Sequence, residues 1–301
     1  MIMFDLIDFS QSSFDEAHRL FHGRGHAYPG YEHLSIDWLS PVALITLYKE
    51  ESSVFLQDLA QQLFDAIEPC TSVQVQYRYL RESPFELLLG EPVTETTVLE
   101  NGLKYHITLG RSQNTGLFLD MRSGRKWVQE HAKNARVLNL FAYTCAFSVA
   151  SLAGQAERVL NVDLSRASLT AGRENHRLNN QDLTKVNFQS VDIFKSFGRI
   201  KKYGPYDLLV CDPPSFQKGS VDIKRDYKKI IRRLPEFMNP NSLLMLCLND
   251  PDLDELFLKE MVALECPSCE YIESIATPDV FVETMSGKGL KVAIYRYQAQ
   301  S

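Results

Sequence analysis

The 301-residue sequence contains no apolar run approaching the roughly 20 residues that a helix needs to cross a bilayer. Its first residues, MIMFDLIDFSQ, lack the basic flank of a signal peptide, so we expect a cytoplasmic protein with no membrane partner. Positive charge is not in excess either, since the formal net charge is -6 and the pI is near 5.7. The chain is therefore not a strongly basic protein that coats nucleic acid, and any contact with RNA must come from a local basic patch.

The cysteines offer few arrangements that could bind a metal ion or form a redox pair. Of the six cysteines, only Cys266 and Cys269 have metal or redox spacing, and no second CxxC or nearby histidine pair completes a site. We therefore assign no metal and expect two reduced thiols in a surface turn.

The second half of the chain alternates short apolar strands with helical patterns, which predicts a parallel α/β sheet with helices on both faces. The apolar runs are residues 137–144, 158–165, 186–193, 206–214 and 242–249. Two further strand patterns, 270–277 and 289–297, close the chain as a late hairpin. Seven strands are more than a dinucleotide-binding fold needs.

The first half predicts a small α+β domain over residues 1–110, followed by a catalytic domain over 111–301. Residues 52–67 place apolar side chains at helical spacing, and residues 96–109 read as a hairpin turning at Asn101-Gly102.

Two other segments of the first half carry local patterns. Residues 12–23 read as a short helix with a serine cap. Residues 72–80 alternate strictly, as a half-exposed strand does.

Polar residues follow the first three strands of the predicted sheet, where its strand order reverses direction. Asp163 could accept both hydrogen bonds from a ribose diol, and Asp192, beside apolar Ile193, could take the amino group of an adenine. The loop after the first strand would cradle the rest of such a cofactor. The predicted cofactor residues are Asn139, Phe141, Ala142, Tyr143, Thr144, Asp163, Leu164, Ser165, Asp192, Ile193 and Asp212.

A nicotinamide dinucleotide is the main alternative cofactor on such a scaffold. It needs G-x-G-x-x-G after the first strand, so that the backbone can approach the pyrophosphate. Here that loop reads FAYTCAF and has no glycine, which disfavours a dehydrogenase.

The fourth strand ends in VCDPPSFQKG, residues 210–219. Asp212 offers acceptors for an exocyclic amine or a ring N–H, while Pro213 and Pro214 fix the backbone and remove two donors. Phe216 is a candidate stacking surface. This pattern predicts a corner that holds a nucleobase flipped out of its stack, and the simpler alternative is a rigid strand end.

These motifs together carry a family resemblance. At TGLFLDMRSGR, VLNLFAYTCAF, NVDLSRASL, ENHRLNN, DIF and VCDPPSF the chain resembles the bacterial 23S rRNA methyltransferases that include a cytosine-5 enzyme and a guanine-N7 enzyme. The likeness runs from about residue 96 to the end. It implies a class I methyltransferase (Rossmann-like) seven-stranded sheet with an antiparallel last strand, S-adenosyl-L-methionine as cofactor, and RNA, most plausibly 23S rRNA, as partner. It also places Arg122 near the cofactor.

Three departures from the family pattern matter. Cys145 stands where the first loop usually has glycine, which bears on the loop's conformation and on cofactor affinity. A full RNA-binding PUA domain is not expected. Asn249 occupies the place of the cysteine nucleophile that cytosine-5 chemistry requires, and Cys247 would face the same way but deeper in the sheet. Guanine N7 or an amine is therefore favoured, with Asn249 holding a base edge.

Two charged segments remain. Residues 218–233 read either as the solvated face of an amphipathic helix, with Tyr227, Ile230, Ile231 and Leu234 inward, or as a phosphate contact, which their position after the corner favours. Residues 22–33 read as an exposed ordered loop that could touch RNA. Metal binding by their histidines is disfavoured, because no third ligand on a shared helix is evident.

Our hypothesis is an S-adenosyl-L-methionine-dependent RNA methyltransferase whose base pocket contains Asp212, Pro213, Pro214 and Asn249. The alternatives are a DNA or protein methyltransferase and a non-catalytic protein that binds RNA or the cofactor on the same fold.

Overall fold

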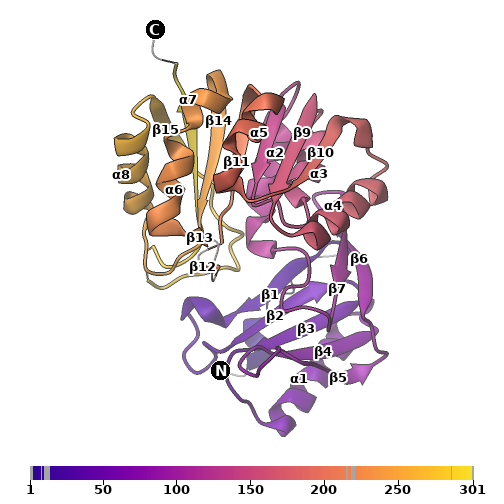
Figure 1. The fold of residues 1–301 in the computed structure, drawn as a ribbon. Helices are drawn as coiled ribbons and strands as arrows, with labels where there is room; N and C mark the ends of the chain where they lie inside the picture. Colours follow the sequence, from indigo (N-terminus) through magenta and orange to yellow (C-terminus); the bar gives the residue numbers. More distant parts are fainter. Residues whose placement is uncertain are drawn as a thin grey trace. The chain divides into compact units, whose positions relative to one another are not determined.

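The computed structural model describes residues 3–7, 9, 14–214, 216–217, 221–285 and 287–299, and of residues 216 and 217 only the backbone. The chain divides into two compact units (Figure 1). The first unit comprises Met1–Arg122 and Pro278–Met285, and the second comprises Ser123–Thr277 and Ser286–Ser301. No helix in the described part of the chain is long and apolar enough to cross a membrane.

The first unit is built on a five-stranded sheet in the order β1-β2-β3-β4-β5. Helix α1 (Ser53–Ala66) joins the parallel pair β3 and β4, and its buried stripe of leucines packs into the unit's core. The predicted helix over 52–67 and the predicted hairpin at Asn101-Gly102 are both confirmed. The strands are β1 (His18–His22), β2 (Leu34–Leu39), β3 (Val42–Leu47), β4 (Ser72–Tyr77), β5 (Phe85–Gly90), and the hairpin β6 (Glu95–Glu100) and β7 (Leu103–Thr108); the 3₁₀ turns are η1 (Met3–Leu6), η2 (Gly23–Gly25) and η3 (Leu119–Met121).

The helix expected over residues 12–23 is wrong. His18–His22 form strand β1, paired antiparallel with β2, whereas residues 12 and 13 lie outside the described residues. The register shifts between Arg19 and Phe21, so Leu20 and Phe21 are both buried and the period-2 signal of a strand is lost.

Strand β4 is buried on both faces, so the expected half-exposed strand is also wrong. Its polar face is covered by other segments. The side chain of Gln74 donates to the carbonyl of Val93 at 2.8 Å, and that of Gln76 donates to the carbonyl of Gln113 at 3.0 Å. Alternation marked the two faces correctly, but it could not show that both are covered.

The loop expected to be exposed over residues 22–33 is partly buried. Gly23 and Gly25 form a buried 3₁₀ turn, and the exposed Arg24 lies 3.9 Å from the centre of the Tyr48 ring. A Cβ on Gly25 would run into the backbone of Val282, so this turn accepts only glycine against the 278–285 segment.

The second unit contains a seven-stranded sheet in the order β10-β9-β8-β11-β14-β16-β15, in which β16 runs antiparallel to the other six strands. The predicted fold class is thereby confirmed, including the reversed last strand. The strands are β8 (Arg136–Leu140), β9 (Arg158–Asp163), β10 (Val186–Ser190), β11 (Tyr206–Cys211), β14 (Met238–Leu248), β15 (Cys269–Ser274) and β16 (Lys291–Tyr297), with a small hairpin of β12 (Phe216–Gln217) and β13 (Val221–Asp222).

Helices cover both faces of this sheet. One face packs on apolar side chains of α5, α6, α7 and α8, while Asn139 and Asn161, which point to the other face, reach Ser148 of α3 through hydrogen bonds. The helices are α2 (Arg122–His131), α3 (Ala146–Ala153), α4 (Arg166–Leu178), α5 (Phe197–Tyr203), α6 (Ile223–Ile231), α7 (Leu234–Phe237) and α8 (Glu255–Glu265), with 3₁₀ turns η4 (Leu183–Lys185) and η5 (Ile193–Lys195).

Helix α6 buries Tyr227, Ile230 and Ile231, and Leu234 is buried just after it, as the amphipathic pattern predicts. The hydroxyl of Tyr227 donates to the carbonyl of Cys211 at 3.2 Å. The second turn of α6 is therefore fixed against the last residue of β11.

Candidate active site

The predicted site residues follow strands that end at one rim of the sheet. Strands β8, β9, β10, β11 and β14 are parallel, so their carboxyl ends meet at the same edge. Strands β8 and β11 are neighbours with Leu140 opposite Cys211, and the N–H of Asp212 donates to the carbonyl of Leu140 at 3.5 Å. The two loops assigned to cofactor and base therefore leave the sheet side by side.

The loop after β8 has an unusual backbone. Phe141, Tyr143 and Cys145 have φ values of 59°, 46° and 60°, the left-handed region that residues with a Cβ rarely adopt. Each such residue costs roughly 1 kcal/mol or more, so surrounding contacts must hold the loop in this shape.

Those contacts come from two neighbouring elements, strand β9 and helix α4. The N–H of Tyr143 donates to a carboxylate oxygen of Asp163 at 2.8 Å, and the side chain of Asn175 donates to the carbonyl of Thr144 at 2.9 Å. Ala142 donates from its N–H to the carbonyl of Val162 at 3.2 Å. Strand β9 and helix α4 thus fix the loop that sequence reasoning assigned to the cofactor.

Cys145 is fully buried and packs against helix α4 at Gly172. A Cβ on Gly172 would lie 2.7 Å from the Cβ of Cys145, closer than side-chain atoms approach each other. The cysteine therefore keeps the backbone conformation that a glycine would favour, and a glycine in the facing helix makes the room. Burial, with the nearby Asp163 carboxylate, raises the pKa of the Cys145 thiol well above its usual value, so the thiol stays protonated.

Asp163 ends β9 with its carboxylate held by the backbone. One oxygen accepts the N–H of Tyr143 and the other accepts the N–H of Ser165, each at 2.8 Å. Carboxylate oxygens have further lone pairs, so both can still accept from a ribose diol. Leu164 is exposed beside it, and the hydroxyl of Ser165 caps α4 by accepting the N–H of Ser168 at 3.1 Å.

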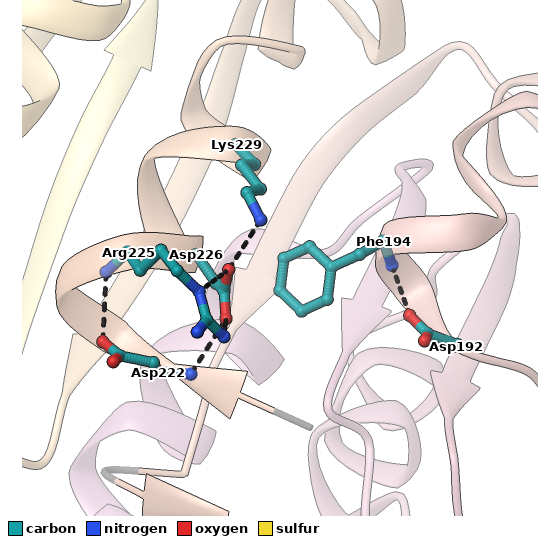
Figure 2. A network of polar contacts seen from close by, with 6 residues as sticks. All are labelled: Asp192, Phe194, Asp222, Arg225, Asp226 and Lys229. Carbon is teal, nitrogen blue, oxygen red and sulfur yellow. Dashed lines mark hydrogen bonds and ion pairs between the residues drawn. The ribbon is translucent and has the colours of Figure 1, made fainter. Parts of the chain in front are cut away.

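Asp192 follows β10 and accepts the N–H of Phe194 at 2.9 Å, which orients its carboxylate at the start of η5 (Figure 2). Ile193, expected to pack against an adenine, is 4% exposed and belongs to the hydrophobic core between the sheet and helices α5 to α8. The neighbouring Phe194 is only partly buried. The assignment of Asp192 and Ile193 to the cofactor stays a prediction.

Asn139 lies within β8 rather than in the loop, and its side chain donates to the amide oxygen of Asn161 at 2.8 Å. From Asn161 the contacts continue to Ser148 at 2.9 Å, to His176 at 2.9 Å and to Gln181 at 2.6 Å. Each of these hydrogen bonds has one donor and one acceptor when His176 is neutral with its proton on Nδ1, the tautomer that these partners assign. The geometry gives Asn139 a scaffold contact, and its direct role toward a cofactor stays a prediction.

Burial is the main reason that the pKa of His176 falls to about 4, and the Arg173 guanidinium lowers it further. Gly172, Asn175 and His176 were not predicted as site residues. The ENHRLNN motif that contains two of them was noted, but no local pattern ties a helix to a loop some 30 positions earlier.

The corner after β11 places Asp212 half-buried and Pro213 buried beside the loop of β8. Of Phe216, the predicted stacking surface, only the backbone is described, so the prediction for its side chain lies outside the described part of the chain. Asn249 is exposed directly after β14. The ammonium of Lys291 holds the next residue in place by donating to the carbonyl of Asp250 at 2.7 Å and to that of Gly287 at 3.0 Å.

Arg122 belongs to the first unit, where its guanidinium pairs with the Glu16 carboxylate and donates to the carbonyl of Ala17 at 3.2 Å. Its predicted role near the cofactor stays a prediction. Across the described ranges, no three His, Cys, Asp or Glu side chains gather closely enough to hold a metal ion.

A sheet of this order with one reversed strand, and with acids at the ends of β9 and β10, defines a class I, Rossmann-like methyltransferase. Residues 18–296 match the family described as S-adenosylmethionine-dependent methyltransferase, and the chain belongs to that family.

The chain is similar to a ribosomal RNA large subunit methyltransferase I of Erwinia tasmaniensis, with 30% identity over 76% of this chain and 60% of the relative. A protein of the same name from Tolumonas auensis is 35% identical over 53% of this chain and 42% of its own length. The chain thus spans only about half the length of these relatives. The crystal structure of SMU.776 complexed with SAH has a TM-score of 0.85 at 26% identity, covering 96% of this chain and 77% of that one.

The M. jannaschii tRNA m1G37 methyltransferase shares the fold, with a TM-score of 0.65 at 15% identity over 88% of this chain and 72% of that one.

The residues at the rim fit the family's cofactor, S-adenosylmethionine. Oriented carboxylates at the ends of two adjacent strands suit an adenosine, and the glycine-free loop lacks the cradle that a pyrophosphate would need. When bound, S-adenosylmethionine supplies an electrophilic methyl group.

Proposed function

We propose that this chain is an S-adenosylmethionine-dependent RNA methyltransferase that modifies a base of large-subunit (23S) ribosomal RNA. The observation that carries the proposal is that the Asp212–Pro214 corner and the Phe141–Cys145 loop leave neighbouring strands at one rim. The names of the two curated relatives support ribosomal RNA as the substrate.

In this mechanism the chain positions two reactants and excludes water. Asp163 and Asp192 would hold the cofactor's ribose and adenine, and the left-handed loop would fix its remaining part. The Asp212 carboxylate would accept a hydrogen bond from an amine or a ring N–H of the flipped base, and Asn249 would hold the same base edge from the end of β14. The two prolines restrict the backbone on either side of the peptide that follows Asp212, which would keep the bound base fixed while it accepts the methyl group.

A non-covalent transfer fits this rim better than cytosine-5 methylation, which needs a cysteine thiolate at the base. Cys211 and Cys247 are fully buried in their strands, and burial raises the pKa of the Cys211 thiol far above its usual value. Asn249 has no nucleophilic side chain. We infer a ring nitrogen or an exocyclic amine as the methyl acceptor.

The test is transfer of a labelled methyl group from S-adenosylmethionine to RNA, DNA and protein fractions from cells that lack this protein. We expect label in large-subunit rRNA, in one base that mass spectrometry of nucleosides then identifies. Label confined to DNA or protein would refute the RNA assignment. Absence of transfer together with absence of S-adenosylhomocysteine binding in calorimetry would refute an enzyme.

A further inference from the structure

Helix α6 carries more cationic side chains near the corner than there are carboxylates to pair with them. The two cations that directly follow the helix each have a carboxylate partner, because Arg232 pairs with Glu265 and Arg233 donates to Glu236 at 2.9 Å. The end near the corner carries four cations, Lys224, Arg225, Lys228 and Lys229, against the carboxylates of Asp222 and Asp226. Two positive charges remain in excess at that end alone.

Asp226 is nearly fully buried and serves two of these cations (Figure 2). It accepts from Arg225 at 2.7 Å, from Lys229 at 2.7 Å and from the N–H of Asp222 at 3.0 Å. The hydrogen bonds from Arg225 and Lys229 hold the pKa of Asp226 well below its usual range. One buried carboxylate thus fixes two cationic side chains that are themselves largely exposed.

Lys224 and Lys228 are one helical turn apart, so they share a face of α6. Within the part of the chain that the structure describes, neither has a carboxylate within 4.0 Å. Lys224 also stands in the first turn of the helix, where the helix dipole disfavours positive charge. Folding stability therefore gives no reason for these two lysines to be there.

Their position relative to the corner does give a reason. The bond from Tyr227 to the carbonyl of Cys211 fixes the second turn of α6 beside the start of the Asp212–Pro214 corner. On the other side, the Lys229 ammonium lies 5.7 Å from the centre of the Phe194 ring, next to Asp192 (Figure 2). The first two turns of α6 therefore lie at the rim, and Lys229 is on the side of the helix that faces the Asp192 turn.

We propose that this face of α6, formed by Lys224, Arg225, Lys228 and Lys229, binds the phosphate backbone of the RNA next to the target nucleotide. The proposal rests on the proposed function, since it names the part of that site that binds the backbone. In a chain of net charge -6, a fixed local excess of positive charge is what phosphate recognition requires.

The test compares the double variant K224Q/K228Q with the control K133Q/K202Q, which removes the same number of positive charges at a different place on the second unit. Lys133 and Lys202 are exposed just before β8 and β11, at the opposite ends of those strands from the corner. The probe is unmodified 23S rRNA transcribed in vitro, with binding measured from 50 to 300 mM KCl. Methyl transfer and S-adenosylhomocysteine affinity are measured on the same proteins.

For K224Q/K228Q we expect the slope of log affinity against log salt to fall by about 1.4, since each lost phosphate contact removes about 0.7. KM for RNA should rise about tenfold at 0.1 M salt, while kcat and cofactor-product affinity stay within about twofold. K224R/K228R should restore the slope, and K133Q/K202Q should match the wild type.

Equal slopes and KM values for the two glutamine variants would overturn the assignment of this face. A wild-type protein that binds S-adenosylhomocysteine but methylates no RNA would overturn the proposed function, and this inference with it. The two failures are separate, because the first is seen only in the variants and the second already in the wild type.

Discussion

Two neighbouring turns at the rim of the second unit are kept rigid in different ways. The corner after β11 is fixed locally, by two prolines that restrict their own backbone. The loop after β8 contains no proline or glycine and adopts three left-handed residues that its own sequence disfavours. Its shape is imposed from outside, by Asp163, Asn175 and the space above Gly172.

The difference teaches where each turn is vulnerable. A locally restrained turn should lose function only when its own residues change, whereas an externally held loop should respond to changes in helix α4. The corner is also readable from sequence, since prolines are visible there, but the supports of the loop are distant in the chain.

The largest effect should come from Asp212→Ala in the corner. Methyl transfer should fall by about 10³-fold, because the base loses its hydrogen-bond acceptor in a preorganised site. Because the prolines and the loop after β8 are unchanged, the affinity for S-adenosylhomocysteine should stay within a few fold. Labelled methyl transfer and calorimetry measure the two quantities.

Asp212→Asn serves as the matched control for shape. It keeps one acceptor oxygen, so an activity between those of the wild type and the alanine variant is expected. Full activity in Asp212→Ala would show that the base pocket has been assigned to the wrong residues.

The second effect concerns the buried network behind the loop. His176 has a pKa of about 4 in the folded protein and an ordinary value near 6.5 when unfolded. Between these pH values the unfolded chain binds a proton at His176 that the folded chain does not. The contribution of neutral His176 to the free energy of unfolding is therefore fully present above pH 6.5 and is lost as the pH falls toward 4. The loss should be about 3 kcal/mol.

Urea unfolding at pH 7, 6, 5 and 4 measures this loss. In His176→Gln the decline should be shallower by most of that amount, although the variant starts less stable. His22, whose burial lowers its pKa to about 3, titrates in both proteins and cancels in the comparison. Parallel curves for the two proteins would rule out a titrating His176.

A third effect should follow from Gly172→Ala, which places a methyl group against Cys145. We expect a loss of about 2 kcal/mol in unfolding free energy, as for other overpacked core sites. The affinity for S-adenosylhomocysteine should fall about tenfold, because the Phe141–Cys145 loop must shift. Thermal or urea unfolding and calorimetry test both expectations.

Gly198→Ala is the matched control, because its new Cβ would meet nothing within 4 Å in helix α5. There alanine should stabilise the helix by up to about 1 kcal/mol. The double variant Cys145→Gly with Gly172→Ala should recover most of the affinity. If it does not, the contact between these two residues is not what shapes the loop.

The same distinction explains how much of the fold could be predicted. The sheet of the second unit follows from continuous apolar runs alternating with helical patterns, and its fold class is confirmed. In the first unit, the register shift at Leu20 removed the period-2 signal of β1, whereas β4 kept its alternation but gave no sign that its polar face is covered. Residues 278–285, which join the first unit from far along the chain, show no sequence pattern that indicates this.

Site residues divide in the same way. Acids at strand ends, such as Asp163 and Asp192, could be placed at the rim because parallel strands end together. Asn175 and His176 could not be given roles, since their contacts with Thr144 and Ser148 depend on tertiary packing. Asn139 was expected in the loop but lies in the strand below it, because β8 continues to Leu140.

The smallest effect should come from Cys145→Gly, although this position departs from the family's usual glycine. Glycine removes the strain of the left-handed conformation, about 1 kcal/mol. It also leaves a cavity where the buried thiol was and increases the conformational entropy of the unfolded chain, and both of these changes destabilise the folded protein. These contributions oppose each other, so the unfolding free energy should change by no more than about 0.5 kcal/mol. The affinity for S-adenosylhomocysteine should stay within about threefold.

Cys145→Ala separates the two contributions. Alanine loses the thiol contacts with α4 but keeps the strained backbone, so it should be less stable than Cys145→Gly by about 1 kcal/mol. Measured by urea unfolding, the expected order is cysteine and glycine close together, with alanine below both. An alanine variant as stable as the glycine variant would show that the backbone of this loop carries no strain. In that case the loop would resemble the corner, with its shape fixed by its own residues.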